Sequence, residues 1–475
     1  MKPRYCNGVG EAHVGAGGGE RTVRMNIQYA LPEFMSRTLR ARFREFRIPS
    51  GAQRDCSVVV PAVKGTLLLK YGIHSYTFYN FSTLKGLEVT IPHREIIRFK
   101  MKKLRRAQWY RESSLFSVLF KRFHYKFTFL EQLMLMTVPH TVTPVEDGRV
   151  FINLWAYFGY VEIDCRQKAA TYRLLNDPAY RRILGSQQYF DRDTRQRYYV
   201  TYALGESLGR IDRVDNPVRC TVYKQRMDTG TTECVWTGAF ADYVHDMVVD
   251  GNRRYCVVPE LGLYTDEKDR IVPSRVLILD LSTKKSWTIK RFSVAAHAQF
   301  HPDDPTVVFF SNHNFYFEHT RLLTLLKKAT YTVKFKGPAS IFRYHITPDG
   351  PEETGVFTRP DFFRLTNFHV FNHRNRTIIA AIGFPDMIFL IDALTMDYIK
   401  TIVVGNAGHA LRLKSRKRAG VGTISPSSDG EKLYVQTTRS FQVVDVETGE
   451  AEMVIKHFFT RTCSNHMQTV PDCGW

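Results

Sequence analysis

The sequence predicts an all-β fold, and three observations support this prediction. Short β-rich runs recur along the chain, turns containing Asp, Gly, Asn or Pro separate them, and several runs end in Asp directly before a turn. Segment 423–456 is the clearest example, because its stretches "SPSSDGEKLYV" and "VVDVETGE" are typical of β-hairpins joined by turns. An apolar fraction of 44% with 33 Phe and 24 Tyr supplies a large core.

The same pattern recurs in six earlier segments. These segments begin at Ser57, His140, Gln188, His245, His297 and His369. Four of them lead to a β-rich run that is followed by, or ends in, an aspartate, namely Asp164, Asp228, Asp280 and Asp392. The later strands of the segment that begins at His297 are expected within residues 320–335.

Seven four-stranded units of about 45 to 55 residues each predict a seven-bladed β-propeller. Two parallel stacks, or a sandwich with a second domain, are alternatives that do not explain the recurrence. The unit at 423–456 resembles the YVTN-type repeat of bacterial propellers in its "SPSSDGEKLYV" and "VVDVETGE" stretches.

The expected domain organisation follows from these units. Residues 1–50 form an N-terminal extension, whose glycine-rich start is expected to be partly disordered, and residues 461–475 form a C-terminal tail. The propeller occupies residues 51–460, with a basic, partly helical insertion at 94–136 between blades 1 and 2.

Composition indicates a basic protein of a reducing compartment. The chain has 67 Lys and Arg against 46 Asp and Glu, a net charge of +21, which suits an anionic partner if the charge is clustered. Its eight cysteines contain no CxxC pair, and several lie in apolar runs, as buried free thiols do. The sequence shows neither the apolar region of a secretory signal nor a run long enough to span a membrane. We therefore expect a cytoplasmic protein that can also associate peripherally with a membrane.

Histidines are enriched at one position of the repeat. The first residue of each innermost strand is expected to project toward the propeller axis; these residues are Ser57, His140, Gln188, His245, His297, His369 and Thr423. Imidazoles that converge from separate blades would form a nitrogen cage for Fe²⁺, Mn²⁺ or Zn²⁺. We therefore predict a metal site formed by the four histidines, with Gln188 as an additional site residue. The alternative is that each histidine is structural and bonds a loop carbonyl.

Two enzyme families share short motifs with this chain. "VHDMVV" at His245 resembles the His-Asp motif of carotenoid cleavage oxygenases, and "HAQFHPDDPTVVFFSNH" at His297 resembles a segment of oligogalacturonate lyases. The first resemblance implies iron held by four histidines, and the second implies manganese held by histidines and a glutamine. The order of the motifs departs from the oxygenases, and His313-Asn314 stands where the lyases have His-Glu.

Basic side chains cluster in two loops. The predicted membrane or anion contacts are Lys102, Lys103, Arg105, Arg106, Lys121 and Arg122 in the insertion, and Arg416, Lys417 and Arg418 before the last blade. Segment 94–127 interleaves them with aromatic residues, which favours contact with an anionic membrane surface over nucleic acid, while a helical cap across the propeller is the structural alternative.

The sequence contains no P-loop, dinucleotide fingerprint, nucleophile elbow or HExxH motif. We expect a metal-dependent enzyme acting on a small-molecule substrate, with an iron-dependent oxygenase or isomerase of an apolar organic substrate favoured. A manganese-dependent lyase of acidic oligosaccharides is the second hypothesis. A non-catalytic propeller whose basic faces bind a protein, nucleic acid or membrane is the third.

Overall fold

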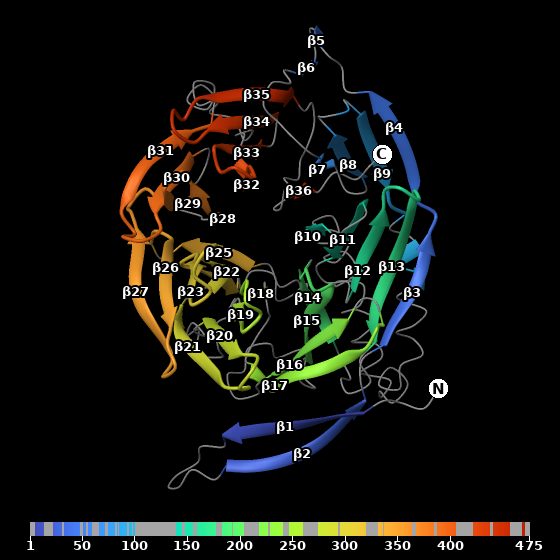
Figure 1. The fold of residues 1–475 in the computed structure, drawn as a ribbon, viewed down its shortest axis with the longest axis vertical. Coiled ribbons are helices and arrows are strands. Elements are labelled where there is room, and N and C mark those ends of the chain that lie inside the picture. The colour runs from blue at the N-terminus through green and yellow to red at the C-terminus, as the bar shows by residue number, and fades with distance from the viewer. Residues whose placement is uncertain are drawn as a thin grey trace. The chain divides into compact units, whose positions relative to one another are not determined.

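The computed structural model confirms the predicted fold class, an all-β seven-bladed propeller (Figure 1). It describes residues 5–13, 22–30, 33–47, 51–53, 56–58, 66–71, 75–80, 83, 85–92, 95–96, 98–99, 139–144, 148–154, 159–176, 183–191, 193–203, 218–226, 229–240, 247–259, 274–292, 295–319, 331–335, 337–362, 367–383, 387–404, 421–437, 440–456 and 468–470. These residues form seven antiparallel sheets of four or five strands, the blades, and three two-stranded sheets.

The chain divides into two compact units. The first unit comprises Met1–Leu31, Gln187–Arg418 and Ser428–Glu431. Its four blades, in hydrogen-bonding order, are β14 (Ile183–Asp191), β15 (Gln196–Ala203), β16 (Val218–Arg226) and β17 (Thr232–Phe240); β18 (Val248–Val249), β19 (Tyr255–Pro259), β20 (Ser274–Asp280) and β21 (Ser286–Phe292); β22 (Ala295–Phe300), β23 (Val307–Asn312), β26 (Ser340–Ile346) and β27 (Pro351–Thr358); and β28 (Phe368–His373), β29 (Arg376–Gly383), β30 (Met387–Asp392) and β31 (Tyr398–Val403). Two hairpins, β1 (Tyr5–His13) with β2 (Thr22–Ala30) and β24 (Phe315–His319) with β25 (Tyr331–Phe335), accompany them.

The second unit comprises Pro32–Ser186, Ala419–Ser427 and Lys432–Trp475. Its three blades are β10 (Pro139–Pro144), β11 (Arg149–Leu154), β12 (Gly159–Asp164), β13 (Ala169–Asn176) and β3 (Glu33–Leu39); β36 (Gln468–Val470), β7 (Thr66–Tyr71), β8 (Ser75–Asn80), β9 (Lys85–Thr90) and β4 (Arg42–Arg47); and β32 (Val421–Pro426), β33 (Lys432–Thr437), β34 (Ser440–Asp445) and β35 (Ala451–Lys456). A short hairpin joins β5 (Gly51–Gln53) and β6 (Cys56–Val58). We call each blade by its first strand in this order.

A shared hairpin explains the repeated aspartates. The third strands β12, β20, β30 and β34 all end in Asp, and Oδ1 of each accepts a backbone N–H two or three residues later. The fourth residue after each Asp has positive φ, which ends the turn and starts the outer strand; these residues are Lys168, Lys284, Met396 and Gly449. In the β14 blade Arg226 holds the equivalent place before Gly230, and Asp228 lies outside the described residues.

Two details of the predicted strand order are wrong. The later strands of the β22 blade are β26 and β27, and residues 331–335 instead form β25 of a separate hairpin. Ser57 lies in β6, whereas the first strand of its expected blade is β36, provided by residues near the C-terminus. Both differences are long-range pairings, which local patterns do not specify.

The cores form between neighbouring blades. Phe310 of β23 lies 5.2 Å from Phe292 of the β18 blade and 5.0 Å from Tyr344 of its own blade, measured between ring centroids. Its side chain is fully buried, and such burial contributes about 1.5–3 kcal/mol. Of the insertion 94–136, the structure describes helix at residues 95–96 and 98–99. Within the described part of the chain no helix is long and apolar enough to cross a membrane.

Candidate functional site

His297 lies in a bulge of β22. The ladder to β23 pairs Ala296 with Ser311 and Ala298 with Phe310, so His297 is the extra residue between two successive pairs of the ladder. Its φ is 48°, a left-handed conformation that is uncommon for a residue with a side chain. The side chain is 7% exposed, and its ring stacks on that of His313 with centroids 5.6 Å apart. The bulge therefore turns this histidine out of the regular alternation and against a second histidine.

His369 lies on β28, opposite Ala380, and is half-buried. Gln299 of β22 bonds to the backbone on both sides of it. The Gln299 amide donates to the Phe368 carbonyl oxygen at 2.7 Å, and its own oxygen accepts from the Val370 N–H at 2.9 Å. A single side chain thus joins the first strands of two neighbouring blades and fixes the backbone that carries His369.

The other predicted site residues are described in less detail. His140 occupies a bulge of β10, between the pairs Pro139 with Leu154 and Thr141 with Asn153, as His297 does in β22. Gln188 lies in β14, and His245 lies outside the described residues. No group of three or more His, Cys, Asp or Glu side chains in the described ranges is arranged to hold a metal ion.

The predicted basic contacts also lie outside the described residues. They are Lys102, Lys103, Arg105, Arg106, Lys121, Arg122, Arg416, Lys417 and Arg418.

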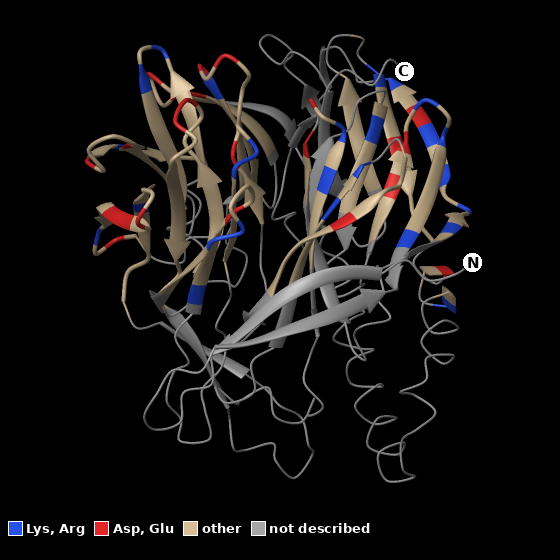
Figure 2. Cartoon of the chain, turned by 60° about the horizontal axis from the view of Figure 1, so that its bottom comes forward, with Lys and Arg blue, Asp and Glu red and all other residues tan. Residues whose placement is uncertain are grey.

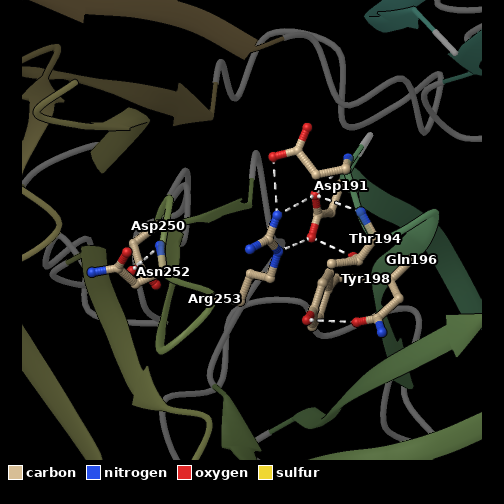
Figure 3. A network of polar contacts seen from close by, with 8 residues as sticks. Asp191, Thr194, Gln196, Tyr198, Asp250, Asn252 and Arg253 are labelled. Atoms are coloured by element: carbon tan, nitrogen blue, oxygen red, sulfur yellow. Dashed lines mark hydrogen bonds and ion pairs between the residues drawn. The ribbon is translucent and has the colours of Figure 1, made fainter. Parts of the chain in front are cut away.

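A polar network joins the first hairpins of the β14 and β18 blades (Figure 3). The Arg253 guanidinium donates to the Asp191 carboxylate through Nε and at 3.3 Å through Nη2, which also donates to Asp193 at 3.0 Å. Thr194 donates its hydroxyl to Asp191 at 2.5 Å. The Asp191 side chain is 8% exposed and that of Arg253 is 31% exposed. We call Asp191 and Arg253 the blade clamp.

The clamp controls the ionisation of Asp191. Burial acts to raise the pKa of this carboxyl, but hydrogen bonds from Arg253 and Thr194 and the guanidinium charge outweigh it and hold the pKa below its usual value. Burial, together with the nearby negative charge of Asp191, raises the pKa of Tyr189 and of Tyr198 to about 12. In the neighbouring turn, burial raises the pKa of Asp250, although this carboxylate accepts backbone N–H groups from Asn252 and Tyr255.

A buried histidine forms a further polar contact, between the end of β28 and the tip of another hairpin. His373, 1% exposed at the end of β28, places Nδ1 3.0 Å from the carbonyl oxygen of Gly430. Gly430 has a φ of 70°, and a Cβ at this position would collide with the Asn372 carbonyl oxygen. Only glycine fits this approach without a shift of the backbone.

These polar groups have a common role. Gln299 and the blade clamp connect neighbouring blades, and His373 locks a hairpin tip to the end of β28. Sequence reasoning missed Gln299, the clamp and the pairing of His297 with His313. Turn motifs such as "FDRDT" and "DGNRRY" mark the hairpins of the clamp, but pairing between blades has no local signal.

Comparison with known proteins assigns no family. No protein-family description matches the sequence, and no characterised protein matches it significantly. The crystal structure of the Saccharomyces cerevisiae Sqt1 is similar with a TM-score of 0.36 and 10% identity, over 57% of this chain and 59% of that one. The likeness to oxygenases and lyases therefore rests on the sequence motifs alone.

Proposed function

We propose that this protein is an interaction propeller that binds an anionic partner through exposed basic side chains. The observation that supports it is the use of several buried and partly buried polar side chains. Gln299, His373 and the Asp191–Arg253 clamp all bond to neighbouring blades or hairpins, as expected of a scaffold that holds a fixed surface. Exposed side chains would then bind the partner, and the net charge of +21 of the chain favours a polyanion.

Binding of the full chain to three anions tests this function. Fluorescence anisotropy would measure affinity for poly(U), heparin and phosphatidylserine vesicles between about 50 and 200 mM salt. We expect submicromolar binding of at least one at low salt, with log K falling linearly in log salt as counterions are released. Binding of none of the three at the lowest salt would contradict the proposal.

A metal-dependent enzyme is the second candidate. The placement of His140 and His297 in equivalent kinds of bulge favours it, because bulges concentrate next to active sites and re-aim side chains. His140, His245, His297 and His369 would then hold Fe²⁺, with Mn²⁺ and the participation of Gln188 as the lyase variant. The metal would supply Lewis acidity or oxygen chemistry to a small-molecule substrate.

Metal analysis of the purified chain separates the two candidates. A stoichiometric first-row metal that is lost in His297→Ala supports the enzyme, and iron or manganese would distinguish an oxygenase from a lyase. A metal-free wild type, with His297→Ala equally stable in urea, would remove this candidate.

A further inference from the structure

The N-terminal segment supplies the outermost strands of two blades. β3 pairs with β13 of the β10 blade, and β4 pairs with β9 of the β36 blade, so residues 33–47 run along two sheet edges. Five exposed arginines lie within eleven residues of this segment; they are Arg37, Arg40, Arg42, Arg44 and Arg47. We call these residues the arginine edge. Blue bands mark Lys and Arg on these outer strands in Figure 2.

Apolar side chains anchor the arginine edge. Leu39, 5% exposed, and the partly buried Phe43 pack into the core between the two blades. Phe46 lies directly over Gly86, where any side chain would collide with its ring, and contacts Tyr79 with ring centroids 5.7 Å apart. Phe43 and Phe46 are three residues apart and lie on opposite faces of β4, so each face of the strand is anchored while the five arginines remain exposed.

Three carboxylates of the described residues lie along this edge; one of them, Glu95, accepts the Arg40 backbone N–H at 3.3 Å, and one of the other two pairs with an arginine side chain. Arg44 pairs with Glu88 at 2.6 Å, and the one acidic residue between Arg37 and Arg47, Glu45, pairs with Lys168 at 2.8 Å. Within the described part of the chain the other four arginines form no ion pair. Lys85 stands opposite Arg47 in the ladder and adds positive charge at that end.

The chemistry of the edge fits a phosphodiester chain. Arg42 and Arg44 are two residues apart and share one face of β4, a spacing of about 6.6 Å, and Arg47 lies on the other face. All five basic residues are arginine, whose planar guanidinium binds phosphate oxygens in a bidentate manner. A flexible single strand can bend to reach arginines on both faces of the outer strands, whereas the backbones of a duplex are held in a fixed helix.

A membrane fits this edge less well. Phe43 and Phe46 of β4 are partly buried, and the large exposed apolar side chains in the described ranges, Val356, Leu394, Tyr398 and Val403, all lie in the other unit. An interfacial site needs apolar groups that insert between lipids.

We propose that the arginine edge binds the backbone of single-stranded nucleic acid through its phosphates. This deepens the proposed function and rests on it. The contacts carry no base specificity, because guanidinium groups on phosphate read charge and spacing only. Affinity should therefore depend strongly on salt and weakly on base sequence.

Substitution of four arginines in the full chain tests the proposal. The edge variant is R37Q/R40Q/R42Q/R47Q, and the control R195Q/R226Q/R374Q/R376Q removes the same charge from exposed arginines of the other unit. We expect the edge variant to bind a 20-nucleotide poly(U) at least tenfold more weakly at 50 mM salt. Its salt slope should fall by up to about three, at about 0.7 per lost phosphate contact. The control should retain wild-type affinity within about threefold.

The outcomes separate this proposal from the broader one. Equal loss in both variants, or tighter binding of wild type to duplex than to poly(U), overturns the arginine edge while polyanion binding stands. If phosphatidylserine vesicles displace poly(U) from wild type, and the edge variant does not bind these vesicles, the partner of the edge is a membrane and not nucleic acid. If the edge variant unfolds, the four Arg→Lys changes keep the charge, and we expect weaker binding with an unchanged slope; unchanged affinity would refute bidentate contact.

Discussion

The blade clamp makes a measurable prediction about stability. Arg253→Ala leaves the Asp191 carboxylate 8% exposed without its cationic partner. Removal of one partner from a fully buried pair costs about 3–5 kcal/mol. Because Arg253 is itself 31% exposed and Thr194 still donates to Asp191, we expect a smaller cost, about 2–3 kcal/mol. Urea denaturation of wild type and variant, monitored by Trp fluorescence, measures it.

Asp193 provides a matched control for the clamp. It bonds to the same guanidinium at 3.0 Å but is 84% exposed, so Asp193→Asn should change stability by less than about 1 kcal/mol. If Arg253→Ala costs no more than Asp193→Asn, the clamp does not hold the two blades together, and its proposed scaffold role is refuted.

The clamp also predicts a pH dependence. The folded pKa of Asp191 lies below its usual value, so its contribution to stability is present above the unfolded pKa of about 3.9 and is lost as pH falls. The difference in stability between wild type and Arg253→Ala should therefore be largest near neutral pH and shrink below about pH 4. A difference that grows on acidification would refute this assignment.

Three further predictions concern single positions. Gly430→Ala should cost at least about 1 kcal/mol more than Gly230→Ala in urea denaturation, because both have φ near 70° but only Gly430 faces a backbone oxygen. Gln299→Ala should cost about 1–3 kcal/mol and speed hydrogen exchange at Val370, since two bonds to β28 are lost. The pKa of Asp280 is lowered to about 2, so its carboxylate should stabilise the fold at pH 7 by roughly 1 kcal/mol after allowance for screening. Asp280→Asn should therefore lower the free energy of unfolding at pH 7, and this loss should shrink as the pH falls toward 2, where wild type loses the same contribution. A stability unchanged at pH 7 would contradict it.

The fold was largely predictable because its repeated hairpin is local. An Asp at the end of the third strand satisfies the turn with its own carboxylate, and the outer strand begins after one residue of positive φ, so about six residues encode the corner. The β14 blade has Arg226 in place of the aspartate, yet its backbone forms the same turn between Arg226 and Gly230. The strand from the C-terminus and the outer strands β3 and β4 could not be predicted, because their partners lie far away in sequence.

The candidate site was predictable only in part, for a related reason. A strand start is visible in sequence, but a bulge depends on the ladder that the strand joins, and a one-residue change of register reverses the direction of a side chain. His297 lies in such a bulge and contacts His313, sixteen residues later, across the β22–β23 hairpin. Charge presents the opposite case. The arginines at 37–47 can be read from the sequence, but their exposure along the outer strands β3 and β4, with Arg44 paired to Glu88, depends on strand pairing with partners far away in the chain.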